Sequence, residues 1–213
     1  MTGDDPWVMY YVVRKDAPLS RERAMALAGA GAVLCADRFR QSNRWLPAFH
    51  SWSARPRKVA LRATAEEIAH LRDSVDCVCL EDVLVALPPC LRSDRVGLVG
   101  DLRPYTDGPR PKEPDPPAPP FSMTYVTRPG VLRTAGKAMA QAGHAALGCA
   151  DAFGPRFPRS FTEWRWRGCP GRVQEVSDEV WAELSSQGVV VADAGLTQVE
   201  PGTETVIALP PRP

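Results

Sequence analysis

Residues 137–153 read KAMAQAGHAALGCADAF and residues 23–39 read RAMALAGAGAVLCADRF, at a constant offset of 114. Ten of these 17 positions are identical. The residues before each stretch keep the same offset, because Tyr11–Arg14 (YVVR) aligns with Tyr125–Arg128 (YVTR). Alanine favours helix, and the preceding β-branched and aromatic runs favour strand. The sequence therefore predicts a strand-and-helix unit that occurs twice.

The two copies differ in their polar side chains. Lys137, Gln141 and His144 stand at i, i+4 and i+7, which places them on one face of a helix. Their counterparts in the first copy are Arg23, Leu27 and Ala30. We interpret this difference as a site that the second copy retains and the first copy lacks.

A proline-rich segment separates the two copies. Seven of the 14 residues in 107–120 are proline, which excludes helix and paired strand. We predict a domain at 1–106, a stiff extended linker at 107–120 and a second domain at 121–213. With 44% hydrophobic residues, each half has enough apolar side chains for a small core.

Each half is predicted to be an α/β unit with the element order β-α-β-α-β-β. In the second half we expect strands at 122–127, 172–176, 189–191 and 205–209, and helices at 134–153 and 177–188. In the first half we expect later strands at 58–61, 77–80 and 96–99, and a helix at 64–72. The aromatic, arginine-rich stretches after the long helices are expected to be loops. The predicted fold is α/β, with two tandem units, each a roughly four-stranded mixed sheet flanked by helices, joined as a pseudo-dimer.

Composition narrows the function classes. The six cysteines show no C-x-x-C pair, so we predict structural thiols and no metal site. No signal peptide and no apolar run of membrane-spanning length is evident, so we expect a soluble, cytoplasmic protein. The net charge of +1 does not indicate a nucleic-acid-binding protein.

Arginine is nevertheless clustered next to aromatic residues. Residues 38–58 hold six basic and no acidic side chains, and residues 156–172 hold five arginines against one glutamate. Such stretches either bind phosphates and stack on bases, or are solvated loops whose aromatics enter the core, and both interpretations stay open. Under the first interpretation, the candidate substrate-binding residues here are Arg156, Arg165 and Arg167.

A polar loop, DAGLTQVEPGT at 193–203, follows the strand expected at 189–191. Ligands of open α/β sheets gather at the carboxyl ends of strands, and Gly195 and Gly202 permit tight turns near a ligand. Loops of this composition are also common as plain connections. The loop therefore gains meaning only together with the helix.

Together the two motifs resemble a known family. GKAMAQAGHA at 136–145 resembles the G-K-x-x-A-Q-x-x-H-A helix of peptidyl-tRNA hydrolase type 2, the archaeal and eukaryotic type, and the 193–203 loop resembles its D-A-G-x-T-Q-x-x-P-G-[ST] signature. The resemblance covers residues 122–210. The first half is identified only through its similarity to the second, as a degenerate copy.

The resemblance implies a compact α/β fold, usually a homodimer, that hydrolyses the ester between a peptide and the 3′ end of tRNA without a cofactor. The positions that match the family's active centre are Lys137, Gln141, His144, Asp193, Thr197 and Gln198, with Thr203 and Thr205 at neighbouring hydroxyl positions. We expect Asp193 to orient or deprotonate water and Lys137 to stabilise an oxyanion or hold a phosphate. Gln141, Thr197 and Gln198 would position substrate, whereas His144 is either a proton shuttle or a structural histidine.

The chain departs from the family pattern at Ala135 and Leu196, where basic residues are common. The first half departs further, and we expect it to act as a pseudo-subunit that makes the protein a monomer. Three functions remain: a peptidyl-tRNA hydrolase, an acyl-tRNA-dependent transferase or hydrolase with a specialised substrate, and a non-catalytic RNA-binding protein. The partner in each case is tRNA or another RNA.

Overall fold

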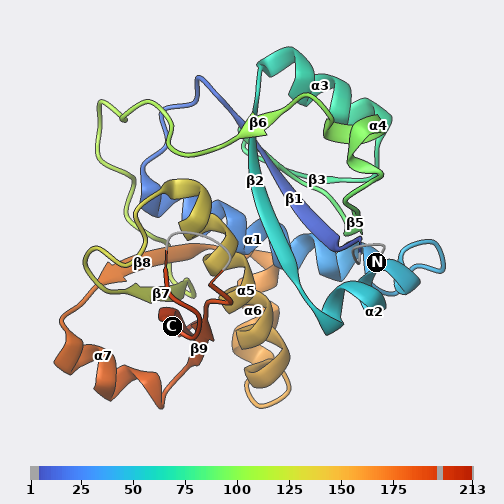
Figure 1. Cartoon of the computed structure of the whole chain (residues 1–213). Coiled ribbons are helices and arrows are strands. Elements are labelled where there is room, and N and C mark those ends of the chain that lie inside the picture. The colour runs from blue at the N-terminus through green and yellow to red at the C-terminus, as the bar shows by residue number, and fades with distance from the viewer. Residues whose placement is uncertain (1–4, 196–198, 213) are drawn as a thin grey trace.

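The computed structural model describes residues 5–195 and 199–212, and the side chains of all of these except Val96 and Leu98. Two β-sheets lie on either side of a central pair of long helices (Figure 1). We call residues 5–106 the N-terminal lobe and residues 121–212 the C-terminal lobe. Between them, residues 107–120 form neither helix nor strand.

The N-terminal lobe consists of β1 (Trp7–Arg14), α1 (Arg21–Phe39), α2 (Leu46–Ala54), β2 (Arg57–Ala63), α3 (Ala65–Ser74), β3 (Val78–Leu80), β4 (Leu84–Ala86), β5 (Cys90–Leu91), α4 (Arg95–Val99) and β6 (Arg103–Pro104). The C-terminal lobe consists of β7 (Met123–Thr127), α5 (Ala135–Phe153), α6 (Pro158–Trp166), β8 (Gly171–Glu175), α7 (Asp178–Ser185), β9 (Val189–Ala192) and β10 (Glu204–Leu209).

Both sheets are mixed. The first has the order β3-β4-β1-β2-β6, with β5 also paired to β1, and the second has the order β8-β7-β10-β9. In each, the first strand of the lobe runs parallel to the strand after its long helix and antiparallel to the last strand of the following hairpin. The run β2-β1-β4-β3 therefore has the same order and directions as β8-β7-β10-β9.

The two long helices pack against each other, and each also contacts the sheet of the other lobe: α1 packs on β8, and α5 packs on β2. Two reciprocal contacts allow this close approach. A Cβ on Gly143 of α5 would overlap the hydroxyl of Tyr11, and a Cβ on Gly29 of α1 would overlap the hydroxyl of Tyr125. Both tyrosine rings are fully buried. Glycine is needed at these two helix positions because a ring from the opposite lobe occupies the Cβ space.

The long helix of the second half is confirmed with its predicted start. Thr134 is the N-cap of α5, and its hydroxyl accepts a hydrogen bond from the amide of Lys137. The strand expected at 189–191 is confirmed as β9, and the one expected at 205–209 as β10. Ser177 is the N-cap of α7, which begins at the expected place, and the first turn carries the acidic residues Asp178 and Glu179.

Three expectations for secondary structure are wrong. Residues 96–99 belong to the short helix α4, and the strand that pairs with β1 is instead β4, which lies between the strands expected at 77–80 and 96–99. The two aromatic stretches expected to be loops contain α2 and α6. Each of these helices has proline in its first turn, where the missing amide costs no hydrogen bond; Pro158, which follows the end of α5, is the first residue of α6.

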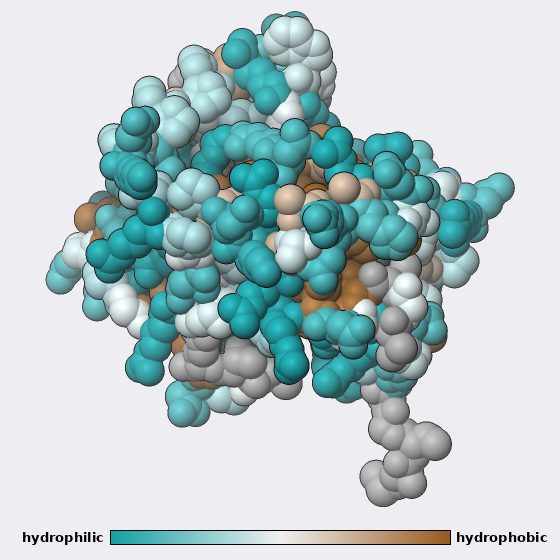
Figure 2. All heavy atoms as spheres, turned by 90° about the horizontal axis from the view of Figure 1, so that it is seen from above, coloured by the Kyte–Doolittle hydropathy of each residue, from teal (hydrophilic) through white to brown (hydrophobic). Residues whose placement is uncertain are grey.

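The surface seen in Figure 2 is mostly hydrophilic, with hydrophobic residues visible in a few hollows. Every helix within the described ranges is too short or too polar to cross a lipid bilayer.

Candidate active site

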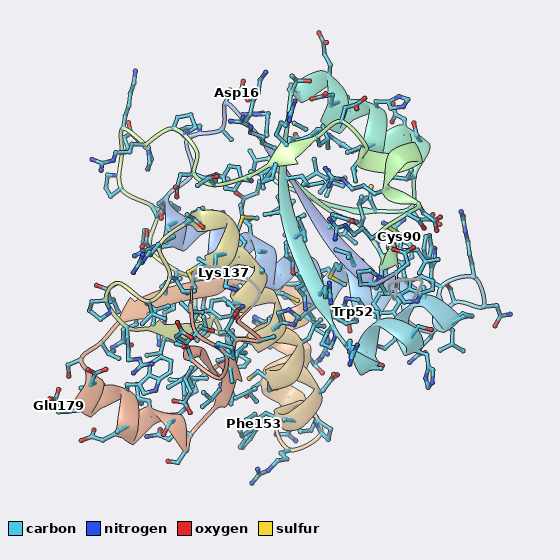
Figure 3. The ribbon with its side chains drawn as sticks, viewed as in Figure 1. Asp16, Trp52, Cys90, Lys137, Phe153 and Glu179 are labelled. Carbon is cyan, nitrogen blue, oxygen red and sulfur yellow. The ribbon has the colours of Figure 1, made fainter. Side chains whose placement is uncertain are left out.

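The polar residues of the second copy meet at one edge of the second sheet. β9 ends at Ala192 and β10 begins at Glu204, so the loop between them leaves the sheet there. Because β10 is antiparallel to β7, this is the edge where β7 ends. The N-terminal half of α5, which carries Lys137, lies over the same edge, while Phe153 marks the far end of the helix (Figure 3).

Four side chains form a connected, buried network. The Asp193 carboxylate pairs with the Lys137 ammonium, and its Oδ2 accepts a hydrogen bond from Gln141 Nε2 at 2.6 Å. The Thr205 hydroxyl lies 3.0 Å from Gln141 Oε1 and 3.1 Å from the carbonyl oxygen of Val191, and can donate to either. The Asp193 side chain is only 4% exposed and that of Lys137 10%. The orientation of each group is therefore fixed by its partners rather than by solvent.

The backbone holds the aspartate in place. The amide of Asp193 donates to the carbonyl of Thr203 at 2.9 Å, and the amide of Gly202 donates to the backbone carbonyl of Asp193 at 2.7 Å. The amide of Gly195 donates to Asp193 Oδ1 at 2.8 Å. Gly195 has a φ of +71° and its Cβ position is filled by the ring of Pro201, so only glycine fits this turn.

The predicted loop residues have different outcomes. Thr205 joins the network, whereas the Thr203 hydroxyl donates to the carbonyl of Glu200 at 2.7 Å and so closes the loop. Thr197 and Gln198, like Leu196, lie outside the described residues.

The start of α5 is held by the end of the N-terminal lobe and by the first residue of the linker. The amide of Ala135 donates to the Asp107 carboxylate at 3.0 Å, and the amide of Gly136 donates to the carbonyl of Thr106 at 3.1 Å. A Cβ on Gly136 would overlap the carbonyl oxygen of Tyr105. These contacts satisfy amides that have no partner inside the helix and fix the first turn, which carries Lys137.

His144 lies one turn beyond Gln141 on α5 and contacts the other lobe. Its Nδ1 is 2.9 Å from Nζ of Lys58 on β2, and its ring is stacked at 6.4 Å and 6° on Trp52 of α2. Burial, and then the positive charges of Lys58 and Lys137, hold the pKa of His144 well below its usual range. The imidazole is therefore neutral near pH 7 and can act as one donor and one acceptor.

The structure does not bring the three predicted arginines to this network. Arg167 precedes β8, at the edge where β7 and β8 begin, and donates a hydrogen bond to Glu163 at 2.7 Å. Arg165, in the same region, donates a hydrogen bond to Asp37 at 2.7 Å. Arg156 follows the end of α5, about 18 Å of helix beyond Gln141 at 1.5 Å per residue.

Several aromatic residues of the two arginine-rich stretches belong to the core. Phe49, Trp52, Phe161 and Trp164 are at most 4% exposed, whereas Trp166 is 79% exposed. The core interpretation is therefore right for these four side chains.

The face of α1 that corresponds to the Lys137, Gln141 and His144 face of α5 carries no buried polar network among the described residues. Leu27 and Ala30 line a cavity of about 460 Å³ between α1, the beginning of β8 and the linker. Arg23 pairs with Glu81 at the side of this cavity, and Asp82 is exposed and bonds Arg72 at 2.6 Å. The buried amide and carboxylate of the C-terminal lobe thus have no equivalent here in the part of the chain that the structure describes.

The cysteines and other candidate ligands do not form a metal site among the described residues. No three His, Cys, Asp or Glu side chains come together there. Five of the six cysteines are buried and Cys79 is exposed. Burial raises the pKa of the Cys149 and Cys169 thiols to about 12, so both are protonated near pH 7.

Sequence reasoning missed Lys58 as a residue of this region. A weak signal was present: Lys58 and Ala60 lie on the same face of β2, and a strand alternates between faces. Ala60 is buried, so a lysine two residues earlier points towards the interior. No feature of the sequence indicated that its partner is a histidine 86 positions away.

As a whole, the network offers a carboxylate, an ammonium, an amide and a hydroxyl. Such groups can orient a water molecule and stabilise negative charge that develops on an oxygen. No serine or cysteine nucleophile belongs to the network. The arrangement suits hydrolysis by activated water rather than through a covalent intermediate.

Comparisons with known proteins place the C-terminal part of the chain in one family. Residues 121–213 match the family described as Peptidyl-tRNA hydrolase PTH2. A peptidyl-tRNA hydrolase of Methanocaldococcus jannaschii is 33% identical over 43% of this chain and 86% of its own length. One of Pyrobaculum aerophilum is 36% identical over 43% of this chain and 84% of its own length. The mitochondrial peptidyl-tRNA hydrolase 2 of Mus musculus is 33% identical over 44% of this chain, and the match spans 56% of the mouse protein.

Proposed function

The chain belongs to the peptidyl-tRNA hydrolase PTH2 family, and from this we propose that its C-terminal lobe hydrolyses the ester between a peptide and the 3′ end of tRNA. The matches cover less than half of this chain, all in its C-terminal part. The activity is therefore assigned to that lobe.

The observation that carries the proposal is the buried network of Lys137, Asp193, Gln141 and Thr205. Burial of an ammonium and a carboxylate is costly, and neither is required by the packing of a small α/β unit. The N-terminal lobe forms the same strand arrangement with leucine at the position of Gln141. The polar set is therefore dispensable for the fold, which supports a chemical role.

The geometry suggests how the roles are divided. Both donors from α5 bind Oδ2 of Asp193, and among the described residues Oδ1 accepts one hydrogen bond, from Gly195. The second lone pair of Oδ1 is the position at which a water molecule would be oriented and deprotonated. Lys137 would stabilise the negative charge on the former carbonyl oxygen of the ester as the tetrahedral intermediate forms. Ester hydrolysis transfers no electrons, so the proposal invokes no cofactor.

The test compares two acyl-tRNA substrates. The purified 213-residue protein is incubated with an N-blocked aminoacyl-tRNA and with the unblocked aminoacyl-tRNA, and ester cleavage is measured. We expect cleavage of the blocked substrate, lost in Asp193→Asn and retained in the control Asp82→Asn, which removes an exposed carboxylate from the N-terminal lobe. Cleavage of only the unblocked substrate would favour a specialised acyl-tRNA activity, and cleavage of neither by folded protein would contradict the proposal.

We further propose that the N-terminal lobe is a degenerate copy of the C-terminal lobe and that the two form an internal pseudo-dimer. The 114-residue repeat, the equal strand order and the reciprocal tyrosine–glycine contacts support this. We call the contact surface between the two lobes, where α1 packs on α5, the seam. Because the seam is buried within one chain, we expect a monomer of 23.3 kDa by light scattering. A dimer that persists on dilution would contradict the pseudo-dimer.

A further inference from the structure

Lys58 is a lysine of the N-terminal lobe that is buried against the C-terminal lobe. It is 8% exposed, and its side chain passes over Gly143, where an added Cβ would lie 2.9 Å from its Cδ. Its Nζ lies 2.9 Å from Nδ1 of His144 and 4.4 Å from the centre of the Trp52 ring. Among the described residues no carboxylate pairs with it. A cation with this environment is costly to bury, so packing alone does not account for it.

The opposite side of the seam lacks both members of the pair. Lys58 pairs with Met9 in the first sheet, and the residue that pairs with the equivalent Met123 in the second sheet is Gly171. The residue that corresponds to His144 on α1 is Ala30. Lysine and histidine thus occur together on the side that faces the polar network, and glycine and alanine occur together on the other.

We propose that Lys58 is a positioning residue for the site in the C-terminal lobe: it donates a hydrogen bond to Nδ1 of His144 and fixes the imidazole in the tautomer that carries hydrogen on Nε2. For its role in hydrolysis, this inference rests on the proposed function. It gives the N-terminal lobe a direct part in the site, although that lobe has lost its own polar network.

The chemistry of the two groups supports this direction. The amino group of Lys58 carries hydrogens that it can donate whether or not it is protonated, and when it donates to Nδ1 that nitrogen must supply the lone pair, so Nε2 carries the ring hydrogen. The indole of Trp52 holds both groups, because its Nε1 donates to the carbonyl of Arg57 at 2.9 Å and its ring faces both the amino group and the imidazole. A fixed donor one helical turn from Gln141 can hold a polar group of the substrate next to the network.

The tautomer can be measured without any substrate. In a ¹⁵N-labelled protein, proton-coupled nitrogen spectra distinguish the protonated from the unprotonated ring nitrogen of each of the three histidines. The signal that disappears in His144→Gln belongs to His144. The other two histidines, His50 and His70, are exposed, and their signals should remain unchanged. We expect Nδ1 of His144 to be unprotonated in the wild type and partly protonated in Lys58→Met, and Lys58→Gln, which keeps a donor, to restore the wild-type state in part.

Kinetics provide the second readout. With N-blocked aminoacyl-tRNA we expect Lys58→Met to lower kcat about tenfold while KM changes less than about twofold, since only the orientation of one group is lost. In a His144→Gln background the same substitution is expected to have no further effect. The control Lys112→Met removes an exposed lysine of the linker and should leave both constants unchanged.

The outcomes separate this inference from the proposed function. A proton on Nδ1 of His144 in the wild type, or an unchanged tautomer in both folded Lys58 variants, overturns the inference whether or not the protein cleaves the ester. A wild type that has the expected tautomer but cleaves neither substrate leaves the Lys58–His144 contact in place and removes the proposed function. Equal kcat for wild type and Lys58→Met overturns the positioning role.

Discussion

The buried pair of Lys137 and Asp193 should show strong coupling in protein stability. We consider Lys137→Met, Asp193→Asn and the double variant. Either single substitution leaves one polar or charged group buried with its main partner removed, whereas the double variant leaves no net charge. The effects of the single substitutions should therefore not add.

The magnitude follows from burial and remaining partners. Removing one member of a buried ion pair costs about 3–5 kcal/mol, and Asp193 keeps donors from Gln141 and Gly195, so we expect about 3 kcal/mol for Lys137→Met. For Asp193→Asn we expect about 2 kcal/mol, because the lysine is 10% exposed and its flexible stem lets the ammonium turn towards water. The double variant should lose only about 2 kcal/mol, which gives a coupling energy of about 3 kcal/mol.

Urea unfolding of all four proteins at pH 7 measures these values. The matched control is the exposed pair Arg23 and Glu81 at the corresponding place on α1, with side chains 30% and 52% exposed. Its cycle, Arg23→Met with Glu81→Gln, should give less than about 1 kcal/mol of coupling. Additivity within about 0.5 kcal/mol for the buried pair would refute the reasoning, because two groups in contact inside the protein cannot be independent.

Three further predictions concern other parts of the molecule. Gln141→Leu, which introduces the residue of the N-terminal lobe, should cost about 1–3 kcal/mol in thermal unfolding but lower kcat on N-blocked aminoacyl-tRNA about 100-fold; an equal kcat would show that the amide does not orient the carboxylate. Lys58→Met should raise stability at pH 7 by about 1–3 kcal/mol. Burial holds the pKa of Lys58 well below its unfolded value of about 10.4, so the unfolded wild type binds more protons than the folded wild type in the pH range between the two values, and the advantage of the variant should shrink as pH rises towards 10; a constant difference in urea unfolding would contradict this. In the native protein at pH 8 a thiol reagent should label Cys79 first, since the other five cysteines are buried, and mass spectrometry of the peptides would contradict this if Cys149 were labelled equally fast.

The sequence predicts the parts of the fold that local rules determine. The start of α5 at Thr134 follows from capping chemistry, and the strands around the polar loop follow from apolar runs bounded by glycine. The assignment of residues 96–99 failed because a run of small and branched residues fits a strand, whereas the pairing position beside β1 is taken by β4. Which strand pairs with β1 depends on the whole sheet, and no window of residues contains that information.

Part of the candidate site was predictable for a similar reason. Lys137, Gln141 and His144 share one helix face, so their spacing alone brings them together. The contact of Gln141 with Asp193 spans 52 residues and became predictable only through the family resemblance. Lys58 could not be linked to His144, because their contact depends on how the two lobes pack.

The seam between the lobes joins stability and function through opposite requirements. Close approach of α1 and α5 needs small residues, and the buried rings of Tyr11 and Tyr125 fill the spaces over the glycines. That packing buries apolar area on both sides of the seam, which stabilises the fold. Lys58 breaks this symmetry, since it introduces an amine into one side of the seam only, beside His144. A residue that is expected to lower stability and yet lies next to the polar network on α5 is the pattern expected when a site, rather than the fold, requires it. The N-terminal lobe would then have lost its own polar network while keeping a lysine that the other lobe uses.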